Sequence, residues 1–213
     1  MKRPFLSFMA LVFSVPAMSA FADNIPYGNA GHVASTQTMT SSGTSLQIYF
    51  YGSSAADDDV IKVIDVTQGW TSGQILDNHA STVGQQVSLP IGSNVVKPGD
   101  ILEFELVNLT TGQTFSSNPG DSADGKNHAY FTSFSGGGGI PAGEFVGFED
   151  LFIGTNSDGV CTGSQNTSDC DYNDDEFVFV GVNAHTPEPS SLALLGTSIL
   201  VAAGLMRRRF AAS

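Results

Sequence analysis

Leu102-Glu103-Phe104-Glu105-Leu106 is the stretch that decides the fold. Its apolar and acidic residues alternate strictly, and a period of two is typical of a β-strand with one buried face and one wetted face. A Lys-Pro-Gly-Asp turn precedes it at residues 97–100, and a Thr-Thr-Gly turn follows at residues 110–112. Turns of this kind on both sides of a short strand indicate antiparallel connections.

Five further strand signals lie outward from this stretch, at residues 46–51, 60–66, 129–134, 145–153 and 176–182. The last of them is apolar on both faces, which predicts a strand in the middle of a sheet. No helical stripe of useful length interrupts them. Many short strands separated by turns are typical of a sandwich or jelly roll. We therefore expect an all-β fold, a single antiparallel β-sandwich or jelly-roll-like domain over residues 23–182, flanked by an N-terminal signal helix and a C-terminal sorting helix.

The charge balance excludes one class of function. The 213-residue chain has a net charge of −13, and a protein that binds nucleic acid needs a basic face. Residues 23–186 hold 20 of the 21 acidic residues but only three lysines, so this part is near −17. Such a charge repels itself and lowers the stability of a compact domain, and a bound cation would relieve the repulsion.

Residues 1–22 are typical of a secretory signal peptide. Lys2 and Arg3 precede an apolar run at residues 5–15, and Ala-Phe-Ala at residues 20–22 supplies the small residues of a cleavage site. The alternative is an uncleaved membrane anchor, but the run is shorter than the ~20 residues that a span requires.

The C-terminus carries three features in order: a linker at residues 183–191, an apolar run at 192–206 that predicts a short transmembrane helix, and a basic cytoplasmic tail at 207–213. The linker contains Pro187, Glu188 and Pro189, and the tail contains Arg207, Arg208 and Arg209. One interpretation is a permanent single-span anchor.

The same three features resemble the PEP-CTERM sorting signal of Gram-negative bacteria. The resemblance implies transient insertion into the inner membrane, cleavage by an exosortase and release to the cell surface or the extracellular space. The mature protein would then keep no transmembrane helix. Sorting systems of this kind are associated with exopolysaccharide-producing bacteria, which implies a partner in an exopolysaccharide (biofilm) matrix.

The densest acidic stretch reads D-C-D-Y-N-D-D-E at residues 169–176 and runs directly into the last strand. Asp169, Asp171 and Asn173 fit the first three ligand positions of an EF-hand loop, but the Gly and Glu of its later positions are missing. A solvated acidic turn is the alternative. The acids adjoin apolar strands, where unpaired charge is costly, and this favours an oxygen-rich metal loop of another kind. Glu149 and Asp150 are the best remote candidates to complete it.

F-E-D-L at residues 148–151 and D-x-D-Y-N-D at residues 169–174 also resemble the C-terminal signature of a family of unknown function, found in exported bacterial proteins and calcium-dependent adhesins. The stretch from about residue 127 to residue 182 fits best. The resemblance implies a β-sandwich that binds Ca²⁺ through Glu149, Asp150, Asp169, Asp171, Asn173 and Asp174. The loop at residues 154–168 is longer than in the family, which leaves Asp158 open as a ligand.

Cys161 and Cys170 are expected to form a disulfide, since a cysteine pair in an exported protein is normally oxidised. The bond would close a ten-residue loop, stabilise by about 2.5–3 kcal/mol on the chain-entropy estimate, and hold Asp169 and Asp171 in place. Two free thiols are the alternative.

Other features leave alternatives open. The Asp-Asp-Asp cluster at residues 57–59 is more typical of a solvated turn than of a second ion site. Trp70 with Tyr49 and Tyr51 could form a sugar-stacking platform, or Trp70 could pack in the core. The histidines have no neighbouring His or Cys at ligand spacing, so surface or hydrogen-bonding roles are expected.

No catalytic signature occurs in the body of the chain, neither G-x-S-x-G nor H-E-x-x-H nor a P-loop. We therefore expect a non-catalytic, calcium-stabilised surface or matrix protein with a structural or adhesive role. A carbohydrate-binding module with calcium-ordered loops is the alternative, and a hydrolase with unrecognised carboxylates is a third hypothesis. An exposed Trp70 beside the tyrosines would favour the module, and a deep cleft with paired carboxylates would favour the hydrolase.

Overall fold

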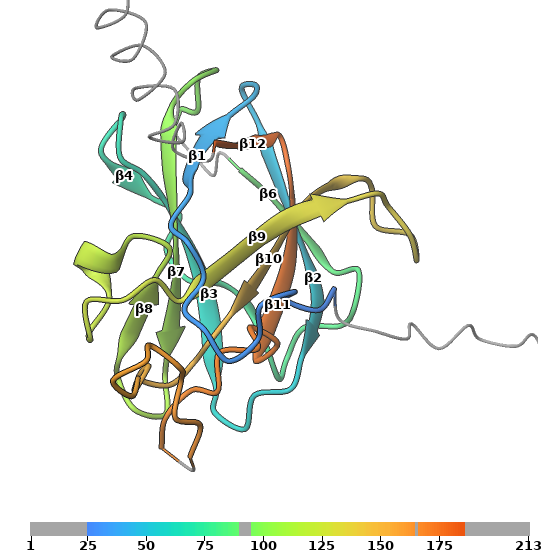
Figure 1. The fold of residues 1–213 in the computed structure, drawn as a ribbon. Helices are drawn as coiled ribbons and strands as arrows, with labels where there is room; N and C mark the ends of the chain where they lie inside the picture. The colour runs from blue at the N-terminus through green and yellow to red at the C-terminus, as the bar shows by residue number, and fades with distance from the viewer. Residues whose placement is uncertain (1–24, 90–94, 165, 186–213) are drawn as a thin grey trace, which may run out of the picture.

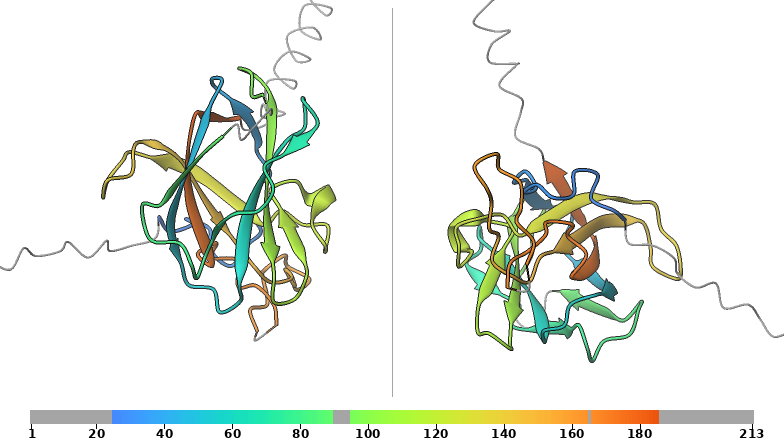
Figure 2. Two further views of the ribbon diagram at one scale, coloured as in Figure 1. Left: turned by 180° about the vertical axis from the view of Figure 1, so that it is seen from behind. Right: turned by 60° about the horizontal axis from the view of Figure 1, so that its bottom comes forward.

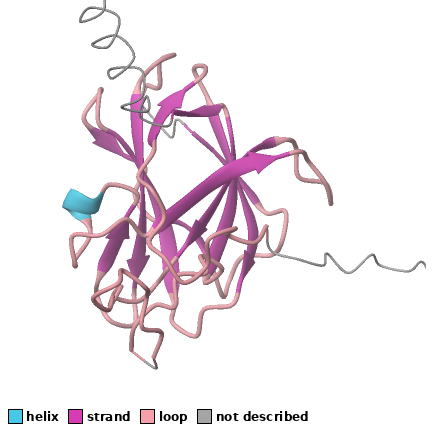
Figure 3. Cartoon of the chain, in the orientation of Figure 1, coloured by secondary structure: helices cyan, strands magenta, loops and turns pink. Residues whose placement is uncertain are grey.

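A computed structural model describes residues 25–89, 95–164 and 166–185. Figure 1 shows them as two layers of antiparallel strands, and the secondary-structure colouring of Figure 3 is almost entirely strand and loop. The expected all-β sandwich is confirmed. The expected signal helix and sorting helix lie outside the described residues. Within the described residues, no helix is long and apolar enough to cross a membrane.

The larger sheet contains seven of the described strands, which are β1 (Thr38–Ser41), β3 (Asp59–Asp65), β4 (Trp70–Thr71), β5 (Ile75–Asp77), β7 (Ile101–Asn108), β8 (Thr114–Ser116) and β12 (Val182–His185). Its order is β12-β1-β7-β3-β4, with β5 paired to β3 and β8 paired to β7. Residues 102–106 lie in β7, at the centre of this sheet. The hairpin predicted through residues 110–112 is the β7–β8 connection.

The second sheet contains five described strands, which are β2 (Leu46–Ser53), β6 (Gln86–Leu89), β9 (Ala129–Phe134), β10 (Gly143–Phe148) and β11 (Asp175–Val180). Its order is β6-β2-β11-β10-β9, so the doubly apolar strand β11 lies in the middle, as predicted. A short 3₁₀ turn, η1 (Pro119–Asp121), follows β8.

The core fills the space between the two sheets. Leu102, Phe104 and Leu106 of β7 all point into it and are almost completely buried. The ring of Phe104 packs on Phe179 of β11 with centroids 4.1 Å apart, which joins the sheets at their centres. Figure 2 shows from two further directions that the loops gather at the ends of the sandwich. A functional site is therefore expected at one of those ends, because binding residues are often carried by loops.

Most strand boundaries differ by one or two residues from the sequence prediction, and two of the predicted strands are shorter or interrupted. The segment predicted to run to residue 153 leaves the sheet after Phe148, where Glu149 donates its N–H to the carbonyl of His128 at 3.1 Å. The segment predicted to end at residue 182 breaks at Gly181, whose φ of 95° ends β11 and begins β12. Both breaks lie where polar loop contacts or a positive φ replace ladder pairing.

Candidate metal centre

The register between β10 and β11 brings the two acidic segments together. Phe148, the last residue of β10, pairs with Asp175, the first residue of β11. The N–H of Asp174 also donates to the carbonyl of Phe148 at 3.2 Å. The acids that follow β10 and those that precede β11 therefore meet at one end of the sandwich, although some twenty residues separate them in the chain.

Glu149 lies at the centre of this meeting point and is completely buried, with 0% of its surface exposed. Its Oε1 accepts a hydrogen bond from the N–H of Tyr172. Its Oε2 makes no hydrogen bond of normal geometry among the described residues, although the nearby Ser168 hydroxyl lowers the pKa of this carboxyl. A buried carboxylate oxygen without a donor is costly, so this oxygen marks a place where a positive ligand would be favoured.

Asp169 and Asp171 face the same point. Ligand oxygens of Glu149, Asp169 and Asp171 all lie within 4.8 Å of one another. Ca²⁺ binds oxygens at about 2.3–2.6 Å, so two oxygens on one ion lie up to about 4.8 Å apart. The three carboxylates therefore fit one ion of this size. A pocket of about 350 Å³, open to solvent and lined in part by Glu149 and Asp169, leaves room for water ligands.

The acidic loop holds this geometry with a covalent link and two unusual backbone conformations. Cys161 and Cys170 form a disulfide, as predicted. Cys170, which lies between the two aspartates, has a φ of 58°, and Tyr172 has a φ of 57°. Left-handed residues outside glycine are uncommon and persist where the surroundings hold them. The left-handed residues Cys170 and Tyr172 alternate with Asp169 and Asp171 along the chain. Both aspartates therefore lie on the side of the loop that faces Glu149.

Tyr172 anchors the loop to the sandwich. Its side chain is buried, and its hydroxyl accepts from the N–H of Ala34 at 2.7 Å and donates to the carbonyl of Asn127 at 3.1 Å. Its backbone carbonyl lies so close to β10 that a Cβ on Gly147 would be 2.2 Å from it. Glycine at position 147 is therefore what allows the loop to lie on the strand.

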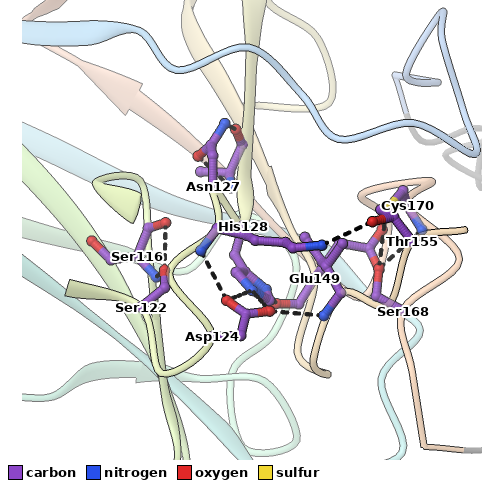
Figure 4. A network of polar contacts seen from close by, with 12 residues as sticks. Ser116, Ser122, Asp124, Asn127, His128, Glu149, Thr155, Ser168 and Cys170 are labelled. Atoms are coloured by element: carbon purple, nitrogen blue, oxygen red, sulfur yellow. Dashed lines mark hydrogen bonds and ion pairs between the residues drawn. The ribbon is translucent and has the colours of Figure 1, made fainter. Parts of the chain in front are cut away.

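A second buried network supports Glu149 from behind (Figure 4). One ring nitrogen of His128 contacts the Glu149 carbonyl at 3.0 Å, and the other contacts the Asp124 carboxylate at 3.0 Å. Asp124 also accepts from the N–H of Ile153 at 2.9 Å. His128 thus has the hydrogen-bonding role that the sequence predicted, and it fixes the backbone at Glu149.

Electrostatics at the site disfavour a charged Glu149 in the absence of a cation. Burial, followed by repulsion from the carboxylate of Asp174, raises the pKa of Glu149 to about 8. The pKa of Asp171 is also raised, by burial and then by Asp169. Groups that are expensive to ionise but are arranged around one point suit a divalent cation, which favours their charged forms.

The six predicted ligands do not all face this point. Asn173 directs its side-chain oxygen to the Ser54 hydroxyl, which donates to it at 2.7 Å. Asp150 adjoins a different acidic cluster that includes Asp59. Asp174 lines the same pocket as Glu149 but directs one oxygen to the Asp150 N–H, and it lies outside the group of three carboxylates. Asp158, which the sequence left open, is exposed in a turn around Asn156, outside the Glu149 group.

Sequence reasoning missed two buried acids. Asp59 was expected in a solvated turn, but it begins β3 and is 1% exposed, so that expectation was wrong for this residue. Asp58 beside it is exposed and pairs with His79 at 2.6 Å, as a solvated turn would. Asp175 was not among the predicted ligands, although it is fully buried at the start of β11. The only available signal was that both immediately precede a run of strand residues.

The suggested sugar-stacking platform does not form. Trp70 lies on β4 of the larger sheet, packs against the core and donates its ring N–H to the carbonyl of Val95 at 2.9 Å. Tyr49 and Tyr51 lie on β2 of the other sheet, where Tyr51 packs edge-on against Phe145. The three rings therefore do not share one surface.

The paired acids Glu103 and Glu105 are also engaged within the fold. Glu105 forms an ion pair with Lys62. Glu103 accepts from the amide of Asn118 at 3.0 Å. Neither arrangement resembles two carboxylates facing each other across a cleft, which glycoside hydrolysis would need.

Comparison with known proteins places one part of the chain. The family model of the PEP-CTERM protein-sorting motif matches residues 185–209. No curated protein and no solved structure is similar enough to this chain to be matched to it. The motif lies almost wholly beyond the described residues and says nothing about the resemblance noted for residues 127–182.

The fold and the match define a class: an exported β-sandwich protein with an acidic, disulfide-linked loop. More particularly, it is a PEP-CTERM-sorted protein. It is exported across the inner membrane, processed by exosortase and sorted to the cell surface or the extracellular space.

Proposed function

We propose that this protein is a non-catalytic structural or adhesive component of an extracellular matrix, and that Ca²⁺ bound by Glu149, Asp169 and Asp171 stabilises its fold. The observation that carries the metal assignment is the buried Glu149 Oε2, which lacks a donor and lies with oxygens of the two aspartates inside a 4.8 Å limit. A cation there would link the end of β10 to the loop that leads into β11.

The lysines of the described residues do not serve this site. Within the described residues, Lys62 pairs with Glu105, Lys97 donates to Gln68 at 3.1 Å, and Lys126 donates to Thr155 at 3.2 Å. No arginine occurs between residues 4 and 206. Three carboxylates without a basic neighbour therefore leave the compensating charge to an ion from solution.

The donor chemistry favours calcium over zinc. All three candidate ligands are carboxylates, and hard cations such as Ca²⁺ take oxygen ligands. Zinc prefers histidine nitrogen and thiolate sulfur. Both cysteines are consumed by the disulfide, and the nearest histidine, His128, uses both ring nitrogens within the fold.

Sorting supports the matrix role. A protein that an exosortase delivers to the surface functions among extracellular polymers, where calcium is available to a weak or moderate site. The resemblance of residues 127–182 to domains of calcium-dependent adhesins favours the same role. The partner consistent with this is an exopolysaccharide.

Metal analysis of the exported protein tests the calcium site. After equilibrium dialysis against Ca²⁺, Asp169→Asn should bind less calcium than the wild type and should show a smaller increase in melting temperature with calcium. Asp158→Asn is the matched control, because it removes the same charge from the same exposed loop but lies outside the group. Equal calcium content in both variants would contradict the site.

The matrix partner needs a separate experiment. Co-sedimentation of the exported protein with exopolysaccharide from its own host should require calcium and should be abolished by chelator. Retention of the protein in the supernatant at all calcium concentrations would contradict an exopolysaccharide partner and would leave the metal site unaffected.

A further inference from the structure

A second acidic cluster lies between the two sheets, beside the Glu149 group but outside it. Asp59 begins β3 of the larger sheet, and Asp175 begins β11 of the smaller one. Their side chains nevertheless lie within reach of each other across the sandwich. Both are buried, with exposures of 1% and 0%. Two carboxylates are thus enclosed at the junction of the two layers.

Three oxygens of this pair lack hydrogen-bond partners among the described residues: Oδ1 of Asp59 and both side-chain oxygens of Asp175. The Ser53 hydroxyl, opposite Asp175 in the β2–β11 pairing, lowers the pKa of Asp175 but does not outweigh the effect of burial. Leaving one such oxygen bare costs on the order of 1–3 kcal/mol, and more when it is charged. The presence of several acids would not by itself indicate a ligand, but these buried oxygens without hydrogen-bond partners do.

Two further carboxylates, which offer oxygen ligands, lie beside Asp59 and Asp175. Asp150, 4% exposed, interacts with Asp59, and its backbone N–H is held by Asp174 at 3.1 Å. Asp57 adds a fourth carboxylate, which accepts from the Asn108 amide at 2.8 Å. The same Asn108 amide donates to the Asp150 carbonyl at 3.2 Å. The Asn108 amide thus holds Asp57 and Asp150 in place but, because it is uncharged, does not compensate their negative charge.

No described lysine serves this cluster, since all three have partners elsewhere. His79 is the nearest basic group, and it lies at the surface, paired with Asp58. The negative charge of this cluster is therefore uncompensated in the protein interior. The dielectric constant is lowest there, so an unpaired carboxylate costs the most free energy.

We propose that Asp59, Asp150 and Asp175 bind a second divalent cation, Ca²⁺ by the chemistry of its ligands, which ties β3 of one sheet to β11 and the end of β10 of the other. This site goes beyond the proposed function and does not depend on it, because none of its three proposed ligands is Glu149, Asp169 or Asp171. Asp174 lies between the two groups, facing Asp171 on one side and Asp150 on the other.

One rival explanation needs no metal. Two carboxylates in contact can share a proton, so that one stays neutral and donates to the other. Burial, followed by repulsion from Asp59, raises the pKa of Asp175 well above its usual value, as such sharing would require. A shared proton and a bound cation differ in what they do to calcium stoichiometry, which makes the two distinguishable.

Calcium stoichiometry of the exported, disulfide-bonded protein, measured by isothermal titration with Ca²⁺ alone, tests the second site. The wild type should bind two ions, and Asp175→Asn should bind one. Asp58→Asn is the matched control, because it removes an exposed acid adjacent to Asp59 and should still bind two. A folded Asp175→Asn that keeps the wild-type stoichiometry overturns the second site and supports the shared proton.

Asp169→Asn separates this site from the first and does not depend on Asp175→Asn folding, since Asp169 is exposed. It should bind one ion if both sites exist. One ion in the wild type and none in Asp169→Asn overturns the second site and keeps the first. One ion in each, lost in Asp175→Asn or Asp59→Asn, supports the second site and overturns the first. No calcium in the wild type overturns both.

Discussion

Phe148 of β10 is the register partner of Asp175 of β11, and this single pairing brings the candidate site together. It sets Glu149 and Asp150, which follow one strand, against residues 169–174, which precede the other. The pairing is fixed by apolar neighbours, since Phe148 and Phe177 are both buried in the main core. A hydrophobic register therefore determines where the carboxylates converge.

Removal of the disulfide should weaken both the fold and calcium binding. Cys161→Ser with Cys170→Ser opens the loop that carries Asp169, and we expect a loss of about 2.5–3 kcal/mol in the free energy of unfolding on the chain-entropy estimate. Denaturant unfolding in chelator measures that part. The calcium Kd of the double variant should also rise, and an unchanged Kd would mean that the bond does not position the ligands.

Gly147→Ala should push the acidic loop away from β10. Its Cβ would meet the Tyr172 carbonyl at 2.2 Å, so backbone must move, and overpacking of this kind costs about 1–3 kcal/mol. We expect a lower melting temperature and weaker calcium binding together. Gly28→Ala is the control, because no heavy atom lies within 4 Å of its Cβ position. Equal melting temperatures for the two variants would contradict the close approach.

Asp124 should make the protein acid-sensitive. Burial opposes its charged form, but hydrogen bonds from His128 and from the Ile153 N–H outweigh burial and lower its pKa to about 2. Tyr172 faces it as well and stays neutral over this range. A depressed carboxylate pKa stabilises the fold above the unfolded value of about 4. That contribution is lost as pH falls from about 4 toward 2.

Unfolding free energies from pH 7 down to pH 2 test this prediction. Asp124→Asn should be less stable than the wild type at neutral pH, and the difference should shrink as pH falls through that window. Asp121→Asn, in the nearby exposed turn, serves as the control. A difference that stays constant across the pH range would show that Asp124 acts through packing rather than charge.

The sorting motif predicts a shortened mature protein. We expect the exported form to lack residues beyond about Glu188, because the match to the motif spans residues 185–209 and exosortase processes such signals. Intact mass of the exported protein measures the new C-terminus. In a host without exosortase, the full C-terminus should be retained, and an identical mass in both hosts would contradict the processing.

The alternation of apolar and polar residues was enough to predict the sandwich, because in β2 and β7 it identifies the face that is buried in the core. The position of β11 in the middle of its sheet followed from its two apolar faces. The extent of the site could not be predicted in the same way. Whether Asp59 meets Asp175 depends on how two sheets stack, which no local pattern encodes, and the orientation of Asn173 toward Ser54 depends on the loop that surrounds it.

The most direct test of the calcium site is the melting temperature of Glu149→Gln relative to the wild type, measured once in saturating calcium and once in chelator. The Gln carbonyl can still accept from the Tyr172 N–H, while the buried acid that is costly to ionise is gone. We expect an inversion: the variant melts lower than the wild type in calcium, where the ion adds about 2.7 kcal/mol at a hundredfold excess over Kd, and at least as high in chelator. A variant that differs from the wild type by the same amount and sign in both conditions would contradict a calcium ion at Glu149.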